Sequence, residues 1–410
     1  MKLLYVVSGQ SYSSSNPGRK IQSLVRCWRE MGHEIELICG GDVLPPRRKE
    51  RVRKGHANLA NPPWYRKKRY LVPIVASISE VLNLKHDRRL AKVVADRIQT
   101  FKPDLYLQRS SRFDGLTLSM AINLGVPTVL EWKDGDVCSP RARRVLRRPD
   151  FYGFSLLKWY ARKIETWKES ATDFFIVESE VLKRRLTHEL GRDSNHFVVA
   201  HNAVEAKDFE IKGIISQSEA RKKLGLHPSD FISTFIGSFA WYQGVELLID
   251  AIATDERLGP PMRVVLVGDG PGRKDVERRT RELGVEDRVD FVGKVPHEMV
   301  PQYLAATNAA VLPDCTDIIS PIKVLEYMSM GLPVVLPDYE ANREVVEHDV
   351  TGLLFEPRDA VALGDQLRRI QQNPELGSQI GEAARKRARE RFSWERTWGR
   401  AILEIRERTK

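Results

Sequence analysis

The stretch SPIKVLEYMSMGLPVVLP, residues 320–337, decides the fold because it joins a helix directly to a buried strand. We expect a helix over 320–330, since Ser320 suits the N-cap and Pro321 the first helical position. The apolar run at 333–337 then predicts a strand that is covered on both faces. Lys323 and Glu326 share one side of this helix. They are either a surface ion pair or a pair that faces a charged ligand.

The same alternation of strand and helix runs along the rest of the chain. It pauses near 205–220 and resumes at 230, and segment 40–75 lacks clear periodicity, so we expect that segment to leave the sheet. The expected strands are 2–7, a second strand within GHEIELI (32–38), 104–108, 126–131, 173–178, 196–200, 230–237, 263–268, 289–293, 309–313 and 333–337, with helices at 19–31, 244–253, 273–283 and 320–330. Strands alternating with helices at this spacing predict parallel sheets. The expected fold class is therefore α/β, with two doubly wound domains.

Composition limits the class of protein. A chain of 410 residues is long for one core, which agrees with two domains, and no apolar run approaches the ~20 residues that cross a bilayer. The opening MKLLYVV is too short for a signal peptide and is better explained as a first strand. Four scattered cysteines argue against a zinc site and against a disulfide framework. We therefore expect a protein of the reducing cytoplasm.

The net charge of +11 is concentrated in two basic clusters, at 47–69 and at 141–148. Pro62, Pro63, Trp64, Tyr65 and Tyr70 interleave the first cluster or follow it. Such segments suit anionic partners, namely lipid headgroups, phosphates or nucleic acid. A solvated loop is the plain alternative. Because no nucleic-acid-binding motif accompanies the clusters, we expect no nucleic acid partner.

Glycine-bearing turns follow several strands of the second half, where ligands bind in doubly wound sheets. They are FIGSFAWYQG (235–244), VLVGDGPG (265–272) and FVGKVP (291–296), and a fourth candidate turn, PDCTDIISPIKVLE (313–326), follows the next strand. Glycine lets backbone approach a ligand, so turns aligned along one sheet edge predict a crevice for a nucleotide diphosphate. Taken alone, 268–272 is either a dinucleotide fingerprint or a tight turn. Lys294 stands where a ribose-binding acid is needed for NAD, which disfavours that cofactor.

The helix over 320–330 carries a cation in its first turn. Exposed N–H groups there hold partial positive charge, so Lys323 is unfavourable unless an anion binds. This predicts a diphosphate at the helix start, with Glu326 free to accept hydrogen bonds from ribose hydroxyls. An acidic pair at Asp134 and Asp136 has the D-x-D spacing of some metal sites, but such short patterns arise often by chance, and we expect no metal site.

These motifs occur in an order that resembles the retaining GT-B glycosyltransferases of family 4, over essentially the whole chain. The similar segments are SNPGRK (15–20), MGHEIEL (31–37), VPTVLEWKDGD (126–136), TDFFIVESEVLKRRL (172–186), VVAHNAVEAKDF (198–209), FIGSFAWYQGVELLIDA (235–251), VLVGDGP (265–271), VDFVGKV (289–295), SPIKVLEYMSMGLPVV (320–335), TGLLFEPRD (351–359) and RFSWERTWGRAILEI (391–405).

The resemblance implies two Rossmann-like domains that face a central cleft. Residues 1–207 would bind the acceptor, 208–392 the nucleotide-sugar donor, and the terminal helix in 393–410 would cross back onto the first domain. The resemblance further implies transfer with retention at the anomeric carbon and no required metal or other cofactor.

Carried onto this sequence, the family's motifs assign roles to individual residues. Glu326 would hold the ribose, and Ser320, Pro321, Ile322 and Lys323 would surround the diphosphate. Gly237 and Ser238 would line its phosphate side, with Gly268 and Gly270 nearby and Gly18 approaching from the first domain. Lys294 and Val295 would lie beside the base.

Three positions depart from the family's pattern. Ile318 stands where a first glutamate orients the donor sugar, Gln243 where a basic residue is common, and Lys133 where a histidine precedes Asp134. We hypothesise that Lys323 supplies charge that Gln243 lacks, with Lys133 and Asp134 nearer the reacting sugar. A nucleotide-sugar epimerase of the same fold and a non-catalytic nucleotide-sugar binder remain as alternatives.

The basic clusters predict an acceptor that is anionic or lipid-linked, as in surface polysaccharide synthesis. They also predict peripheral contact with the inner face of the membrane.

Overall fold

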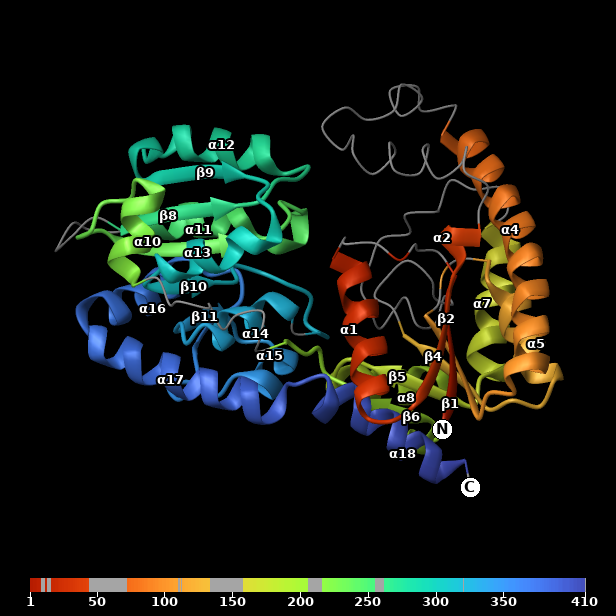
Figure 1. The fold of residues 1–410 in the computed structure, drawn as a ribbon. Helices are drawn as coiled ribbons and strands as arrows, with labels where there is room; N and C mark the ends of the chain where they lie inside the picture. The colour runs from red at the N-terminus through yellow and green to blue at the C-terminus, as the bar shows by residue number, and fades with distance from the viewer. Residues whose placement is uncertain are drawn as a thin grey trace. The chain divides into compact units, whose positions relative to one another are not determined.

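The computed structural model describes residues 1–8, 12, 16–43, 72–109, 111, 113–132, 158–205, 216–254, 262–319 and 321–409. They form two compact units, one of residues 1–201 with 394–410 and the other of residues 202–393. Each unit contains one six-stranded sheet with helices packed on it (Figure 1). This is the α/β class with two doubly wound parallel sheets that the alternation predicted.

The sheet of the first unit has the order β2-β1-β3-β4-β5-β6, and all its pairings are parallel. Its strands are β1 (Lys2–Val7), β2 (Glu34–Cys39), β3 (Leu105–Arg109), β4 (Thr128–Glu131), β5 (Phe174–Val177) and β6 (Phe197–Val199). The helices are α1 (Asn16–Glu30), α2 (Gly40–Val43), α4 (Val72–Phe101), α5 (Gly115–Asn123), α7 (Lys158–Ala171), α8 (Glu180–Leu190) and α18 (Arg400–Arg408), with a 3-10 turn at Ser194–His196. In α1, the stripe predicted by the i, i+3, i+4, i+7 spacing of Ile21, Leu24, Val25 and Trp28 is buried, while Met31, the last residue of that pattern, lies just past the helix and is half-buried.

The end of the chain packs on the first unit. A π-helical turn, Glu395–Gly399, precedes α18. The indole Nε1 of Trp28 donates to the backbone oxygen of Trp398 at 3.5 Å. A Cβ atom at Gly399 would lie 2.5 Å from Sδ of Met31, so a larger residue there would require the Met31 side chain to move. Trp398 is fully buried, which ties the terminal helix to α1.

The sheet of the second unit has the order β12-β11-β10-β7-β8-β9, again parallel throughout. Its strands are β7 (Phe231–Ile236), β8 (Met262–Val267), β9 (Val289–Gly293), β10 (Ala309–Val311), β11 (Val334–Pro337) and β12 (Leu353–Phe355). The helices are α10 (Gln217–Leu224), α11 (Val245–Ala253), α12 (Arg273–Glu282), α13 (Val300–Ala305), α14 (Ile322–Ser329), α15 (Glu340–Val345), α16 (Ala360–Gln372) and α17 (Pro374–Arg391), with 3-10 turns at Trp241–Gln243, Glu286–Arg288 and His297–Met299.

Both faces of this second sheet are covered, which explains the unbroken apolar runs of its strands. Val264 and Leu266 of β8 join one hydrophobic cluster, while Val265 and Val267 join another on the opposite face. Side chains that alternate along a strand point to opposite faces, so a strand between two helical layers needs apolar residues at every position.

The expected strands agree with the structure to within two residues, but β12 was not expected and two helix starts were wrong. Helix α1 begins at Asn16, three residues before the expected start at 19. Helix α14 begins at Ile322, and Pro321 is its N-cap, with φ −68° and ψ 147°. Neither Ser320 as N-cap nor Pro321 as first helical residue is therefore correct. The extended ψ of Pro321 keeps it outside the helix.

Within the described part of the chain, no helix is both long enough and apolar enough to cross a membrane. Of the four cysteines, Cys27, Cys39 and Cys315 are buried thiols, and Cys138 lies outside the described residues. The two basic clusters, at 47–69 and 141–148, also lie outside them.

Candidate functional site

The second sheet has a topological switch point between β7 and β10. The chain starts at β7 in the middle of the sheet, moves outward through β8 and β9, and returns to β10 on the other side of β7. Successive connections therefore leave these two strands on opposite faces, which opens a crevice beyond their carboxyl ends. The residues that follow β7 and β10 are the candidates for ligand contact.

The loops after β7, β8 and β9 are stacked in a row along this edge. The backbone nitrogen of Gly237 donates to Val267 O at 2.9 Å, and that of Gly268 donates to Gly293 O at 2.8 Å. A Cβ atom at Gly268, whose φ is +136°, would overlap the carbonyl oxygen of Gly237. One at Gly270 would lie 2.6 Å from the backbone nitrogen of Phe239. The predicted glycines are thus brought together, and close packing of neighbouring loops requires them.

Helix α14 is fixed against the end of β7 by a tyrosine. The backbone nitrogen of Ile236 donates to the hydroxyl oxygen of Tyr327 at 2.9 Å. Residue 323 lies one turn before Tyr327 on the same side of the helix. The anchor therefore directs Lys323 to the loop that follows β7.

Lys323 reaches the centre of the switch point. Its Nζ donates to Oε1 of Gln243 at 2.5 Å and lies 4.4 Å from the centre of the Phe235 ring. A Cβ atom at Gly237 would overlap this Nζ, so the ammonium group is next to the Gly237 backbone. The hydrogen bond to Gln243 thus holds the ammonium group of Lys323 at the turn that follows β7. Gln243 is the position in that turn where the sequence analysis noted glutamine in place of a basic residue.

Keeping this ammonium group charged costs free energy, because it is removed from water. Removal from water lowers the pKa of Lys323 to about 8, although the nearby carboxylate of Glu326 and thiol of Cys315 act in the opposite direction. The group to which Lys323 donates is a neutral amide. An anion at this position would stabilise the charged form of Lys323.

A second polar group surrounds Asp314, just after β10, within the predicted turn 313–326, where no role was predicted for Asp314 itself. Oδ1 of Asp314 accepts from the Tyr339 hydroxyl at 2.9 Å and from the Cys315 backbone nitrogen at 2.8 Å. Arg358 Nε lies 3.4 Å from Oδ2. The backbone nitrogen of Asp314 also donates to Gln243 O at 3.1 Å, which ties this loop to the turn that carries Gln243. No sequence pattern distinguishes Asp314 from an acidic residue in an ordinary loop.

The first unit holds a buried ionic network at the carboxyl ends of its central strands, which was also missed. Glu131, the last residue of β4, accepts from Tyr5 Oη at 2.9 Å and from Arg109 Nη1 at 2.6 Å. Lys20 Nζ lies 3.2 Å from Glu131 and 2.6 Å from Glu178. Burial alone would raise the pKa of Glu131, but Arg109 and Lys20 outweigh it and hold that pKa low. The network fixes the backbone immediately before the predicted catalytic pair.

Two family models match the chain. Residues 17–203 match the model described as "Glycosyl transferase 4-like domain", and residues 216–387 match "Glycosyl transferases group 1". The chain belongs to the group 1 glycosyltransferases with the GT-B fold.

Similar glycosyltransferases occur in several bacteria. The chain is 26% identical to the alpha-D-kanosaminyltransferase of Streptomyces kanamyceticus, over 64% of this chain and 65% of that protein. It is 27% identical to the N-acetyl-alpha-D-glucosaminyl L-malate synthase of Bacillus anthracis, over 51% of this chain and 53% of that one. The matched region thus spans less than two thirds of either relative.

A solved structure shares the fold along the full length of the chain. The Anabaena protein Alr3699/HepE, in its complex with UDP-glucose, superposes with a TM-score of 0.68 at 18% identity, covering 99% of each chain.

In this glycosyltransferase, some of the predicted site residues lie at the switch point and others do not. Ser238 is exposed beside Gly237, and Glu326 is half-buried on α14. Lys294 is exposed after β9, while Val295 packs against the hydrophobic core. Gly18 is buried in the first turn of α1 and belongs to the first unit.

Three predicted residues, Lys133, Asp134 and Ser320, lie outside the described part of the chain. So does the D-x-D pattern, and among the described residues no group of three His, Cys, Asp or Glu side chains could hold a metal ion. Ile318 is fully buried, so the position of the family's first glutamate presents no polar group here.

Proposed function

We propose that this glycosyltransferase moves a sugar from a nucleotide-diphosphate sugar to an acceptor hydroxyl, with retention at the anomeric carbon. The observation that supports it best is the Lys323 ammonium group beside Gly237, at the switch point of the second sheet. Transfer breaks the bond between the anomeric carbon and a diphosphate oxygen, and negative charge develops on that oxygen. A fixed cation there stabilises the leaving group.

The donor's parts are assigned to residues of the second unit. The diphosphate lies against Gly237, Ser238 and the first turn of α14, next to Lys323. Glu326 accepts from the ribose hydroxyls, and the base lies near Lys294 and Val295. The Anabaena neighbour is described in complex with UDP-glucose, so uridine is the first base to test.

The acceptor and the cellular location belong to the same proposal. The two basic clusters support an anionic or lipid-linked acceptor, used in surface polysaccharide or glycolipid synthesis. The protein would then act in the cytoplasm, peripherally at the inner face of the membrane. Lys133 and Asp134 would act nearer the reacting sugar, and no metal would be required, because Lys323 and the N–H groups of α14 balance the diphosphate charge.

A thermal-shift screen across UDP-, GDP- and dTDP-sugars tests the donor, because a bound ligand stabilises the fold. Stabilisation by one nucleotide series, followed by its release as free nucleotide with an acceptor present, supports transfer. An isomerised donor would indicate an epimerase, and binding without turnover would indicate a non-catalytic protein. The anomeric coupling constant of the product, measured by NMR, tests retention.

A further inference from the structure

Helix α7 of the first unit exposes an unusual set of aromatic side chains. Trp159 is 66% exposed, and Tyr160 and Trp167 are exposed as well. Lys163 stands among them, with its Nζ 4.0 Å from the centre of the Trp159 ring. Three exposed aromatic rings on one side of one helix form an apolar patch of the kind that marks an interaction surface, whereas a single exposed ring does not. This side of α7 therefore has the composition of a docking surface.

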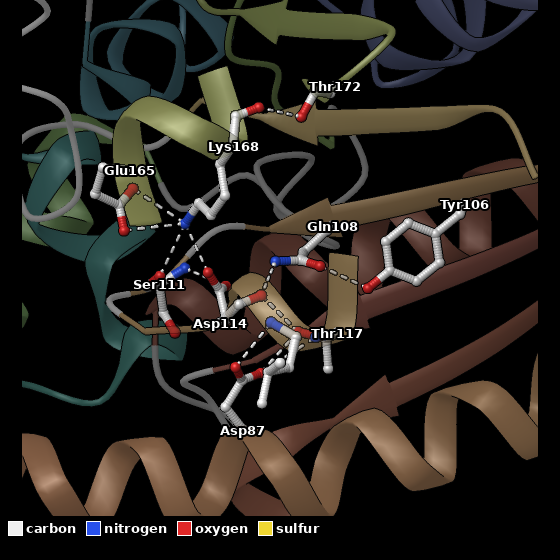
Figure 2. Close-up of polar contacts among 10 residues, drawn as sticks. Asp87, Tyr106, Gln108, Ser111, Asp114, Thr117, Glu165, Lys168 and Thr172 are labelled. Carbon is white, nitrogen blue, oxygen red and sulfur yellow. Dashed lines mark hydrogen bonds and ion pairs between the residues drawn. The ribbon is translucent and has the colours of Figure 1, made fainter. Parts of the chain in front are cut away.

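Both acidic side chains of α7 point away from that surface. Glu165 and Glu169 are buried. Glu165 pairs with Lys168 at 3.1 Å, and Lys168 also lies 2.6 Å from Asp114, the N-cap residue of α5 (Figure 2). The exposed side of α7 thus carries aromatic rings, a lysine and small polar groups but no carboxylate.

Helix α4 also exposes apolar and basic residues at helical spacing. Its exposed side carries apolar residues first and basic residues after them, three and four positions apart, so that they share one side of the helix. They are Val81, Leu82, Lys85, Arg88, Arg89 and Lys92. The acid in that stretch, Asp87, is buried and accepts from the backbone nitrogen of Leu116 at 2.9 Å (Figure 2).

The two helices meet at the start of α5. Asp87 of α4 accepts a hydrogen bond from the first turn of α5, and Lys168 of α7 donates one to Asp114, the N-cap of α5 (Figure 2). A Cβ atom at Gly115 would lie 3.5 Å from the ring of Trp167, and the next residue, Leu116, is exposed. Asp87, Glu165 and Glu169 are therefore gathered inside, while the apolar and basic residues named above stay outside; the exposed acid Asp96 follows one turn after Lys92 and ends the basic stretch of α4. We call these exposed residues of α4, α5 and α7 the α4–α7 face.

We propose that the α4–α7 face docks on the surface of a bilayer that contains anionic lipid. Tryptophan and tyrosine prefer the interfacial layer of a membrane, and lysine and arginine beside them attract acidic headgroups. The basic clusters at 47–69 and 141–148 precede α4 and α7 in the sequence, which adds positive charge of the same kind. A nucleic acid would use the cations but would give no reason for exposed Val81 and Leu82.

This inference rests on the proposed function, since docking would bring the enzyme to a lipid-linked acceptor. It can nevertheless be tested without any sugar transfer. Full-length protein is sedimented with phosphatidylcholine vesicles, with and without about 30% phosphatidylglycerol, and its tryptophan fluorescence is followed. Wild-type protein should partition onto the anionic vesicles at least tenfold more strongly, with a blue-shifted emission.

Two variants and one control make the test specific. Trp159→Ser and the pair Lys85→Glu/Lys163→Glu should each lower partitioning roughly tenfold. The control is Trp241→Ser, because Trp241 is 65% exposed and lies in the second unit. Its vesicle binding should equal that of wild type. Thermal unfolding of every variant shows whether it folds.

Three outcomes would overturn the inference. They are equal partitioning on neutral and anionic vesicles, equal loss in Trp159→Ser and Trp241→Ser, and loss only in the charge-reversed pair. The last pattern, accompanied by charge-dependent retention of duplex DNA, would identify a polyanion-binding surface instead. Nucleotide binding is measured on the same preparations. Vesicle binding without any nucleotide binding would refute the proposed function and leave this inference standing.

Discussion

Replacing Lys323 by methionine should make the protein more stable and its donor binding weaker. Burial lowers the pKa of Lys323 from 10.5 to about 8, which corresponds to roughly 3 kcal/mol of unfavourable free energy for the charged form at neutral pH. Methionine has a similar length and no charge to desolvate. The lost hydrogen bond from this charged donor to Gln243 subtracts about 1.5–3 kcal/mol, so the unliganded protein should gain up to about 1.5 kcal/mol. A gain of about 1.5 kcal/mol is equivalent to a rise in Tm of about 3–6 °C.

Donor affinity should change in the opposite direction. A hydrogen bond between an ammonium and a phosphate oxygen contributes about 1.5–3 kcal/mol, so Lys323→Met should weaken binding of the nucleotide diphosphate about 10- to 150-fold. Calorimetric titration at pH 7 measures the affinity, and scanning calorimetry without ligand measures the stability. Lys323→Arg, which keeps the charge, is the matched control. A joint fall of stability and affinity would mean that Lys323 is only structural, and unchanged affinity would remove it from the site.

The same lysine gives the binding a predictable pH dependence. In the free protein Lys323 is charged below a pKa of about 8, and a bound diphosphate raises that pKa. Affinity is therefore full below pH 8 and falls as pH rises through it, by about tenfold per unit until the pKa of the complex is reached. Lys323→Met and Lys323→Arg should both show a flat profile between pH 7 and 9.5. A wild-type profile that is equally flat would contradict the assignment.

Four further predictions concern the rest of the molecule. Gly268→Ala should cost more than about 3 kcal/mol in urea denaturation, because its φ is +136° and its Cβ would overlap Gly237, whereas Gly284→Ala, with φ +63° and open space around it, should cost only about 1 kcal/mol. Glu131→Gln should lower the free energy of unfolding by about 3–5 kcal/mol, because Arg109 and Lys20 keep buried charges without their carboxylate; a change below 1 kcal/mol would refute this. Burial raises the pKa of Glu165 to about 7, so wild type should lose stability relative to Glu165→Gln as pH rises from 5 to 8, in denaturation series at each pH. Addition of EDTA should leave the initial rate of transfer unchanged, and a loss that Mg²⁺ restores would show that a metal takes part.

The strands were predictable because a parallel strand covered on both faces needs apolar residues at every position. After their first, basic residue, KLLYVV and RVVLV satisfy this condition, and β1 and β8 lie where these runs occur. The start of α14 was misplaced by two residues, since Pro321 suits both the N-cap and the first turn of a helix, and only ψ distinguishes them. Short-range sequence patterns therefore predict where an element lies better than they predict the residue at which it begins or ends.

Contacts between residues far apart in sequence could not be predicted. The bond between Lys323 and Gln243 joins residues 80 positions apart, and it depends on the order of β7 and β10 in the sheet. The network around Glu131 was missed for a related reason. Its members come from β1, β3, β4 and α1, and a charged residue at the end of a strand is normally expected to face solvent.

Lys323 differs from two buried cations of the first unit in the charge of its hydrogen-bond partner. Arg109 and Lys168 each donate to a carboxylate at 2.6 Å, and those partners hold their pKa values above the ordinary range. Lys323 donates to the neutral amide of Gln243, and its pKa falls. A cation whose charge is already balanced stabilises the fold and has little electrostatic attraction left for a ligand. Lys323 donates to a neutral amide, although the carboxylate of Glu326 is near, and it lies beside Gly237, where a switch point places ligands. We propose that Gln243 orients this lysine, so that Lys323 would supply the positive charge that the family resemblance implies at position 243.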